Sequence, residues 1–212
     1  KTAPEPGLNG RSLVYPRGKV LGGCTSVNGM IYMRGQAADY DGWRQMGNTG
    51  WGWEDVLPYF LKSEDHHAGA SAMHGAGGPW KVSRQKLSWE ILEAVQQGAR
   101  EFGIAPRADF NDGNNEGSGF FEVNQTDGVR WNTAKGFLRP AMRRPNLRVL
   151  TRAEAEGLIL EGRRAAGIRF RRKGRVMQAR AAREVLLTAG AINSPKLLEL
   201  SGIGDPEHLR RL

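Results

Sequence analysis

Apolar residues recur at helical spacing in the first half of the chain. Between residues 88 and 102, the repeat consists of Ile91, Leu92, Val95, Ala99 and Phe102. Ser88 can cap this helix and Gly103 can end it. Residues 54–62 begin with acidic side chains and end with a lysine, which complements a helix dipole. We therefore predict helices over both segments, and a third that begins at Asn132 or Thr133 and stops before Pro145.

From residue 147 the pattern changes to short β-like runs. Strands are predicted over residues 147–151, 157–160, 167–172, 175–181 and 184–188. Gly162 and Gly174 are predicted to form tight turns. The last run is apolar on both faces, which is typical of a central strand in a covered sheet. It leads through Gly190 into a helix predicted to begin at Ser194 and Pro195. Such a strand–glycine–helix unit can present backbone N–H groups to a ligand.

Three stretches have the composition of loops. Residues 1–41 are rich in glycine and turn-forming residues, and residues 65–79 combine small residues with three of the four histidines. Residues 109–128 are crowded with Asn, Asp and Gly, so we predict a long ordered loop with a little strand over residues 120–123.

Composition excludes several classes of protein. The single cysteine, Cys24, excludes a disulfide framework and every multi-thiolate zinc or iron–sulfur site. No stretch approaches 18 uninterrupted apolar residues, so a transmembrane helix is not expected. Residues 1–6 lack the apolar core of a signal peptide.

The net charge of +9 is concentrated in one part of the chain. Residues 139–184 hold 14 Lys and Arg against four Glu. Arginines within residues 167–172 largely alternate with apolar residues, which favours the solvated face of a strand. A polyanion-binding module, which would hold nucleic acid or an anionic membrane through phosphate contacts, is the alternative reading. We do not expect nucleic acid as a partner.

A glycine-rich segment near the start is the first candidate site. Gly22 and Gly23 permit positive φ and let a flat or phosphate-bearing ligand approach the backbone. Small side chains follow at residues 24–26, and the Asn28 amide offers both a donor and an acceptor. Without a strand-to-helix context, these residues alone favour a purely structural turn.

Two further sets of residues invite a functional reading that we do not favour. His66, His67 and His74, with Glu64 or Asp65, could bind a metal, but neighbouring side chains in a flexible loop are not expected to face one centre. Tryptophans could form a cation-binding cage, but their scatter along the chain favours packing. The tryptophans are Trp43, Trp51, Trp53, Trp80, Trp89 and Trp131.

A second segment, residues 190–204, completes a resemblance. Together with residues 16–31 it resembles the paired signatures of the glucose–methanol–choline (GMC) oxidoreductases, flavoenzymes that oxidise alcohols with FAD. The similarity is closest to choline dehydrogenase-like members and continues, in family order, through residues 74–79, 109–111, 116–119 and 133–138. It covers nearly the whole chain.

The resemblance implies a set of FAD contacts. In this family the first signature lies along the FAD, and the turn after a sheet strand lies beside its adenosine half. The implied cofactor-binding residues are Val20, Gly22, Gly23, Asn28, Gly29, Met30, Ile31, Ala155, Thr188, Ala189 and Gly190. Some relatives carry a flavin-linking histidine where this chain has Val27, so non-covalent FAD is expected. Cys24 stands where serine is common, and we expect it to be a small packed side chain.

The family's catalytic groups are a histidine that takes the alcohol proton and a second His or Asn. Both are expected beyond Leu212, and His208 is no substitute. The family's opening G-x-G-x-x-G is also absent from the chain. We therefore expect an internal piece of a longer enzyme, which alone would bind FAD weakly at best and turn over no substrate.

The expected fold class is α/β: a partial FAD/NAD(P)-binding (Rossmann-like) domain with part of an α+β substrate domain. Residues 1–41 and 147–212 would belong to the FAD-binding domain, and residues 42–146 to a lid and substrate-side region. The complete enzyme is expected to transfer a hydride from a small-molecule primary alcohol to flavin N5. The residues do not decide which alcohol the enzyme oxidises, which electron acceptor it uses, or whether it acts as a dehydrogenase or an oxidase. A non-catalytic remnant of such an enzyme also stays an alternative. The expected location is the cytoplasm, with membrane association open for the full-length protein.

Overall fold

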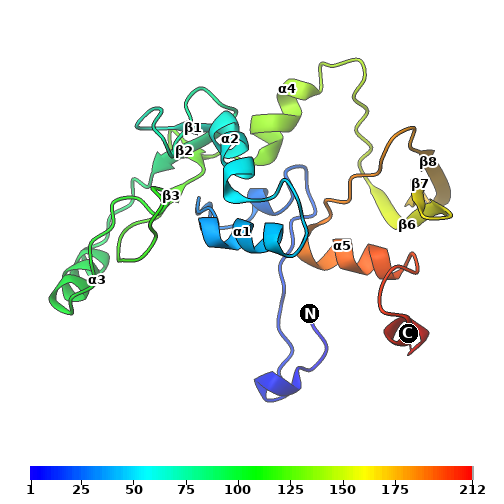
Figure 1. The fold of residues 1–212 in the computed structure, drawn as a ribbon, viewed down its shortest axis with the longest axis horizontal. Helices are drawn as coiled ribbons and strands as arrows, with labels where there is room; N and C mark the ends of the chain where they lie inside the picture. The colour runs from blue at the N-terminus through cyan, green and yellow to red at the C-terminus, as the bar shows by residue number, and fades with distance from the viewer. Residues whose placement is uncertain (212) are drawn as a thin grey trace. The chain divides into compact units, whose positions relative to one another are not determined.

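The computed structural model describes residues 1–211, which form two compact units, Lys1–Leu147 and Arg148–Leu212. Both helices and strands are present, so the predicted mixed α/β class is confirmed (Figure 1). The two units are described separately below.

The first unit contains most of the helices. They are η1 (Pro6–Leu8), η2 (Gly23–Ser26), α1 (Ala37–Gln45), α2 (Trp53–Ser63), α3 (Glu90–Glu101), the π-helix η3 (Ala134–Leu138) and α4 (Arg139–Ala141). The helices predicted over residues 54–62 and 88–102 are confirmed as α2 and α3. Ser88 does not cap α3, because Trp89 is the N-cap residue and the Ser88 hydroxyl donates to Glu93 instead, at 2.9 Å.

Helix α1 was not predicted, since residues 1–41 have the composition of a loop. Its start is specified by a capping box in which the Gln36 N–H donates to Asp39 Oδ2 at 2.7 Å. Helix α1 packs against α2 through edge and tilted aromatic contacts. Tyr40 lies 5.3 Å from Trp43, 5.5 Å from Trp53 and 5.8 Å from Phe60, measured between ring centroids. These two tryptophans therefore serve packing, although they are clustered rather than scattered.

A small mixed sheet organises the same unit. Strand β1 (Glu64–His66) runs parallel to β2 (Trp80–Arg84), and β3 (Glu122–Val123) pairs antiparallel with the end of β2. Strands β4 (Gln125–Thr126) and β5 (Val129–Arg130) form an adjoining hairpin. The predicted strand near residues 120–123 is confirmed, but it is only two residues long.

The interior of this unit is ionic as well as apolar. Glu64 is fully buried, and its carboxylate lies 2.8 Å from Arg34 Nη2 in an ion pair that is not aligned as a hydrogen bond. The same carboxylate accepts the Gly75 N–H at 2.7 Å and faces His74 Nδ1 at 3.2 Å. His74 Nε2 reaches Asp109 at 2.7 Å. The buried carboxylate of Glu64 therefore has an arginine, a backbone N–H and a histidine as partners inside the fold.

Two aspartates at the edge of this network have altered acidity. Burial raises the pKa of Asp109, but hydrogen bonds from the Asn111 amide and His74 outweigh it, so its pKa lies below the ordinary value. The hydrogen bond with Lys81 and one from a backbone amide lower the pKa of Asp65. Both carboxylates are therefore more stable as anions in the folded state than in the unfolded chain.

We expect the first unit to lose stability in acid. A lowered folded pKa contributes stability that is present above the unfolded pKa of about 4 and is lost as the pH falls through the folded value. Urea unfolding at about pH 6, 4 and 3 would measure this loss, and Asp109→Asn should reduce its dependence on pH. A free energy of unfolding that stays constant down to about pH 3 would contradict the prediction.

The second unit is an antiparallel meander with two helices. Strands β6 (Ala153–Glu161), β7 (Arg164–Arg172) and β8 (Arg175–Arg180) pair in that order, and α5 (Gly190–Glu199) packs against β6. Helix α6 (Pro206–Arg211) follows (Figure 1). The small core of this unit contains Ala166, Phe170 and Leu197.

Three local predictions in this region are wrong. Residues 147–151 and 184–188 are not strands, because no segment within residues 1–211 pairs with them. Helix α5 begins at Gly190 rather than at Ser194. The Ser194 hydroxyl still serves the helix start, because it accepts the Ala189 N–H at 3.0 Å.

The arginine-rich strands partly satisfy their own charge. Arg171 lies 2.7 Å from Glu156, with Arg169 at 3.9 Å from the same carboxylate, and Arg180 pairs with Glu161. All of these side chains except Glu156 are about half exposed, and every residue of β8 is exposed. This arrangement matches the solvated strand face that the alternating sequence favours.

Candidate functional site

The glycine segment, residues 20–31, forms a tight turn followed by an extended ribbon. Gly22 and Gly23 have φ values of +92° and +53°, a region that side-chain-bearing residues rarely adopt. A Cβ on Gly22 would also lie 2.5 Å from the Ser26 hydroxyl. The sequence therefore needs glycine at this position for two independent reasons.

Two threonines attach this turn to the start of η3. The Thr25 hydroxyl donates to Gly22 O at 2.5 Å and accepts the Thr133 N–H at 3.0 Å. The Thr133 hydroxyl donates to the same Gly22 carbonyl at 3.2 Å. Asn132 adds a donor to Ser26 Oγ at 2.9 Å. Residues about 110 positions apart in the sequence thus lock the turn in one conformation.

Arg130 fixes the extended part of the segment. Its Nη1 donates to Thr25 O at 3.2 Å and to Asn28 Oδ1 at 3.0 Å. The same Asn28 oxygen accepts the Met30 N–H at 3.1 Å, and Met30 has a φ of +65°. The amide oxygen of Asn28 is therefore used internally to hold a strained backbone, while its NH2 group makes no hydrogen bond within residues 1–211.

The end of the segment joins the edge of the small sheet. Ile31 forms an isolated antiparallel bridge with Val123. The Asn124 N–H donates to Met30 O and the Tyr32 N–H donates to Glu122 O, both at 2.8 Å. Strand β3 thus holds the ribbon in register from one side.

The opposite side of the segment remains open within the described residues. The side chains of Val20, Val27 and Ile31 are more than half exposed, and a Cβ on Gly29 would meet nothing within 4 Å. A rigid ribbon with apolar side chains and accessible backbone can lie along a flat cofactor. Seven of the predicted FAD contacts, from Val20 to Ile31, therefore share one continuous surface segment.

The other predicted contacts belong to the second unit. Ala155 lies in β6 opposite Phe170, just before a register shift. Thr188 and Ala189 precede α5, and Gly190 begins it with a φ of +91°. The role of these residues at a cofactor stays a prediction.

The sequence did not reveal Arg130, because it lies in the short β4–β5 hairpin, which carries no recognisable motif. The only local signal is the turn formed by Asp127 (φ +50°) and Gly128 (φ +74°), which reverses the chain and returns Arg130 towards the glycine segment. Cys24 is half-buried and its sulfur accepts the Gly18 N–H at 3.4 Å, in keeping with a packing role.

The histidine-rich loop has a geometry that the sequence argument misjudged. His66 and His67 do face one group, because both Nε2 atoms reach Glu122, at 3.0 and 2.7 Å. The Ala68 N–H donates to His66 Nδ1 at 3.3 Å. His66 Nε2 must then carry the proton and donate to the carboxylate. Because a metal ligand needs the opposite tautomer, this geometry favours a hydrogen-bonded cluster over a metal site.

No helix within residues 1–211 combines the length and the apolar character required to cross a bilayer.

Sequence comparison connects this arrangement with known proteins. The family model described as GMC oxidoreductase matches residues 5–211. The chain is 42% identical over 209 residues to the oxygen-dependent choline dehydrogenase of Sinorhizobium fredii, which covers 99% of this chain and 38% of that protein. It is 44% identical over 207 residues to the protein of the same name from Brucella suis, again covering 38% of the relative. The chain thus spans about two fifths of the length of these relatives.

Two solved structures share the fold. Pyridoxine 4-oxidase from Mesorbium loti superposes with a TM-score of 0.89 at 32% identity, over 99% of this chain and 42% of its own. An FAD-dependent oxidoreductase from Chaetomium thermophilum gives a TM-score of 0.90 at 28% identity, over 100% of this chain and 39% of its own. With the family model matching almost every residue, the chain belongs to the GMC oxidoreductase family.

Proposed function

We propose that this chain forms part of the FAD site of an alcohol oxidoreductase. The supporting observation is the glycine segment, whose one side is locked by Arg130 and Thr133 and whose other side exposes Val20, Gly29 and Ile31. A preorganised ribbon of this kind binds a cofactor without first paying the entropy of ordering a loop.

The residues present fit an extended dinucleotide. Glycines at 22 and 23 keep the backbone free of side chains, and Met30 and Ile31 offer an apolar surface of the kind that an isoalloxazine ring covers. In the second unit, the glycine at the start of α5 resembles turns that place backbone N–H groups near a nucleotide. Residues 1–41 and 147–212 would supply the FAD-binding parts, and residues 42–146 the substrate side and its cover.

Bound FAD would accept a hydride from the alcohol carbon at its N5 atom. The residues of this chain would orient the cofactor and exclude water from one face. The groups that take the alcohol proton are expected in the remainder of the GMC polypeptide. A small primary alcohol is the expected substrate class, in line with the choline dehydrogenases to which the chain is similar.

Cofactor binding to the chain tests this proposal directly. Titration with FAD, followed by flavin fluorescence, should give a weak but saturable affinity. Arg130→Ala should raise Kd about tenfold, because it removes two hydrogen bonds from a charged donor that fix the segment. Arg44→Ala, at an exposed ion pair with Asp41, is the matched control and should leave Kd unchanged.

One outcome would contradict the proposed FAD site, and another would contradict a non-covalent flavin. One is equal FAD affinity in the Arg130→Ala and unsubstituted chains while the Arg44→Ala control behaves as expected. The other concerns Val27, which has no nucleophile and therefore implies a non-covalent flavin. Flavin absorbance that stays with the polypeptide after acid precipitation would contradict non-covalent binding.

A further inference from the structure

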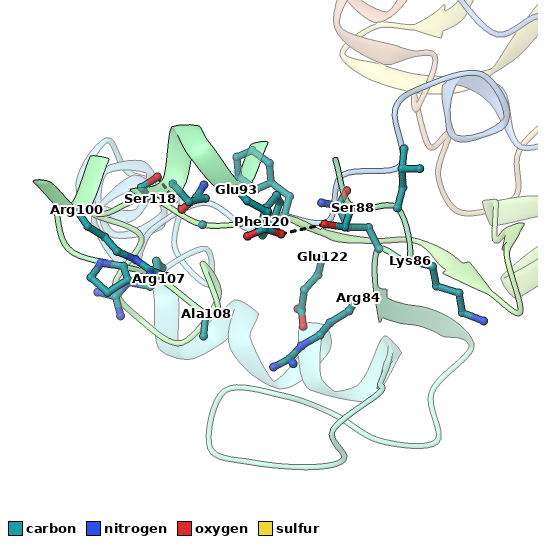
Figure 2. A pocket seen from close by; sticks show the side chains of 16 residues that line it. Arg84, Lys86, Ser88, Glu93, Arg100, Arg107, Ala108, Ser118, Phe120 and Glu122 are labelled. Atoms are coloured by element: carbon teal, nitrogen blue, oxygen red, sulfur yellow. Dashed lines mark hydrogen bonds between the residues drawn. The ribbon is translucent and has the colours of Figure 1, made fainter. Parts of the chain in front are cut away.

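A cavity of about 560 Å³ lies between α3 and the edge of the small sheet (Figure 2). Its walls come from residues 84–88, between the end of β2 and α3, from α3 itself, from loop residues 106–108, and from residues 118–122, which lead into β3. This volume is within the usual range for sites that bind small organic molecules.

Cationic side chains surround this cavity. They are Arg84, Lys86, Arg100 and Arg107. Figure 2 shows Arg100 and Arg107 on one side of Phe120 and Lys86 on the other. Among these four cations, only Arg107 belongs to an ion pair within residues 1–211. Its Nη1 lies 3.1 Å from Asp112, while its buried Nε has no hydrogen-bond partner in the same residues. The other three cations have no carboxylate partner in the same residues.

The carboxylates in the wall are already engaged. Glu93 accepts the Ser88 hydroxyl at 2.9 Å, a bond drawn as a dashed line in Figure 2. Glu122 is buried and faces His66 and His67. A hydrogen bond from a hydroxyl does not cancel the charge of a carboxylate, so the excess of positive charge rests on the count: four cations against two carboxylates in the wall, or three with Asp112. Arg84, Lys86 and Arg100 keep donors that no carboxylate within residues 1–211 uses. Arginine in particular matches the planar, two-oxygen geometry of carboxylate and phosphate groups.

The cavity also leads towards the glycine segment. A neighbouring cavity of about 380 Å³ shares Phe120, Phe121, Gln85 and Gln96 with it and is also lined by Gly29 and Ile31. Leu92 and Val95 of α3 line this second cavity as well. The cationic cavity therefore adjoins one that is lined by residues proposed to face the flavin.

We propose that this cavity, the cationic pocket, binds the negatively charged group of a small organic substrate, with the apolar body of that substrate lying over Phe120 and Phe121. This inference rests on the proposed function, because it assigns the substrate class as an alcohol that carries a carboxylate or phosphate. Among small primary alcohols, the pocket would therefore favour anionic ones over quaternary ammonium alcohols such as choline, which the names of the similar dehydrogenases carry.

Binding of phenyl phosphate and of benzoate to the chain tests the pocket without FAD. Titration followed by NMR shifts of backbone amides in residues 84–88 and 118–122 should show saturable binding of both anions. Benzyl alcohol and benzyltrimethylammonium, which keep the ring but not the anion, should bind at least about tenfold more weakly. Weak binding of both anions and of their neutral analogue alike would overturn the proposal.

A double variant, Arg84→Gln with Arg100→Gln, tests whether anion binding depends on the cations of the cationic pocket. It should raise the Kd for phenyl phosphate at least about tenfold. Arg172→Gln with Arg175→Gln, which removes two charges from the second unit, should leave that Kd unchanged. Equal effects of the two double variants would overturn the proposal, because binding would then follow net charge alone.

FAD affinity separates this inference from the proposed function. The Arg84→Gln, Arg100→Gln variant should keep the FAD affinity of the unsubstituted chain, since neither side chain contacts the glycine segment. Loss of phenyl phosphate binding with retained FAD binding supports the pocket assignment. Absence of FAD binding in the unsubstituted chain counts against the proposed function and against the substrate role, whatever the anion titration shows.

Discussion

Replacing Arg34 by Met is expected to lower the free energy of unfolding of the first unit by about 3–5 kcal/mol. The side chains of Arg34 and Glu64 are 2% and 0% exposed, so the substitution strands a carboxylate that water cannot reach. Arg34 Nη1 also donates to Met73 O at 2.5 Å, and that carbonyl would lose its donor. Urea unfolding followed by tryptophan fluorescence measures the effect, because all six tryptophans lie within residues 1–147.

A second substitution shows whether the loss comes from the unpaired charge. Glu64→Gln in the Arg34→Met background removes that charge but keeps an oxygen for the Gly75 N–H. The double variant should therefore be less destabilised than the sum of the single variants. Arg44→Met, which breaks the exposed pair with Asp41, should change stability by less than about 1 kcal/mol. Similar losses for Arg34→Met and Arg44→Met would contradict the role assigned to the buried pair.

Gly75→Ala is expected to destabilise the same unit by about 3 kcal/mol or more. An added Cβ would lie 1.9 Å from Leu61 O, a backbone atom at the end of α2 that no rotamer change can move. The backbone around Gly75 would have to shift, although its N–H is bonded to Glu64 at 2.7 Å and its carbonyl accepts the His66 N–H at 3.0 Å. Urea unfolding under the same conditions measures the loss.

Gly98→Ala is the matched control for this effect. Gly98 lies in α3, where an added Cβ would meet nothing within 4 Å. Alanine is better than glycine in a helix by about 1 kcal/mol, so this variant should be unchanged or more stable. If both alanine variants unfold at the same urea concentration as the unsubstituted protein, the close approach at Gly75 is not a constraint on the fold.

Structure encoded by nearby residues was predictable from the sequence. Helix α3 and strands β7 and β8 appear where the periodicity of apolar residues places them, because each pattern is completed within one turn or one hairpin. Residues 184–188 have an equally clear strand pattern but no pairing partner within residues 1–211. A strand is defined by its neighbour, so its own sequence cannot decide the outcome.

The same distinction between local and long-range contacts applies to the residues of the candidate site. Gly22 and Gly23 could be found directly, because a backbone with positive φ strongly favours glycine. Arg130 and Glu122 could not, because each meets its partners only after the chain folds back over some 55 to 105 positions. Glu122 also explains why neighbouring histidines converge: the group that they share comes from another strand.

The exposed apolar residues at the start of α3 bear on how the polypeptide behaves when it is produced in cells. Trp89, Ile91 and Val95 each leave more than half of their surface in contact with water. Stripes of this kind attract chaperones during synthesis and drive self-association as concentration rises. Soluble yield should therefore depend on growth temperature and expression level, and purification is best planned at low protein concentration.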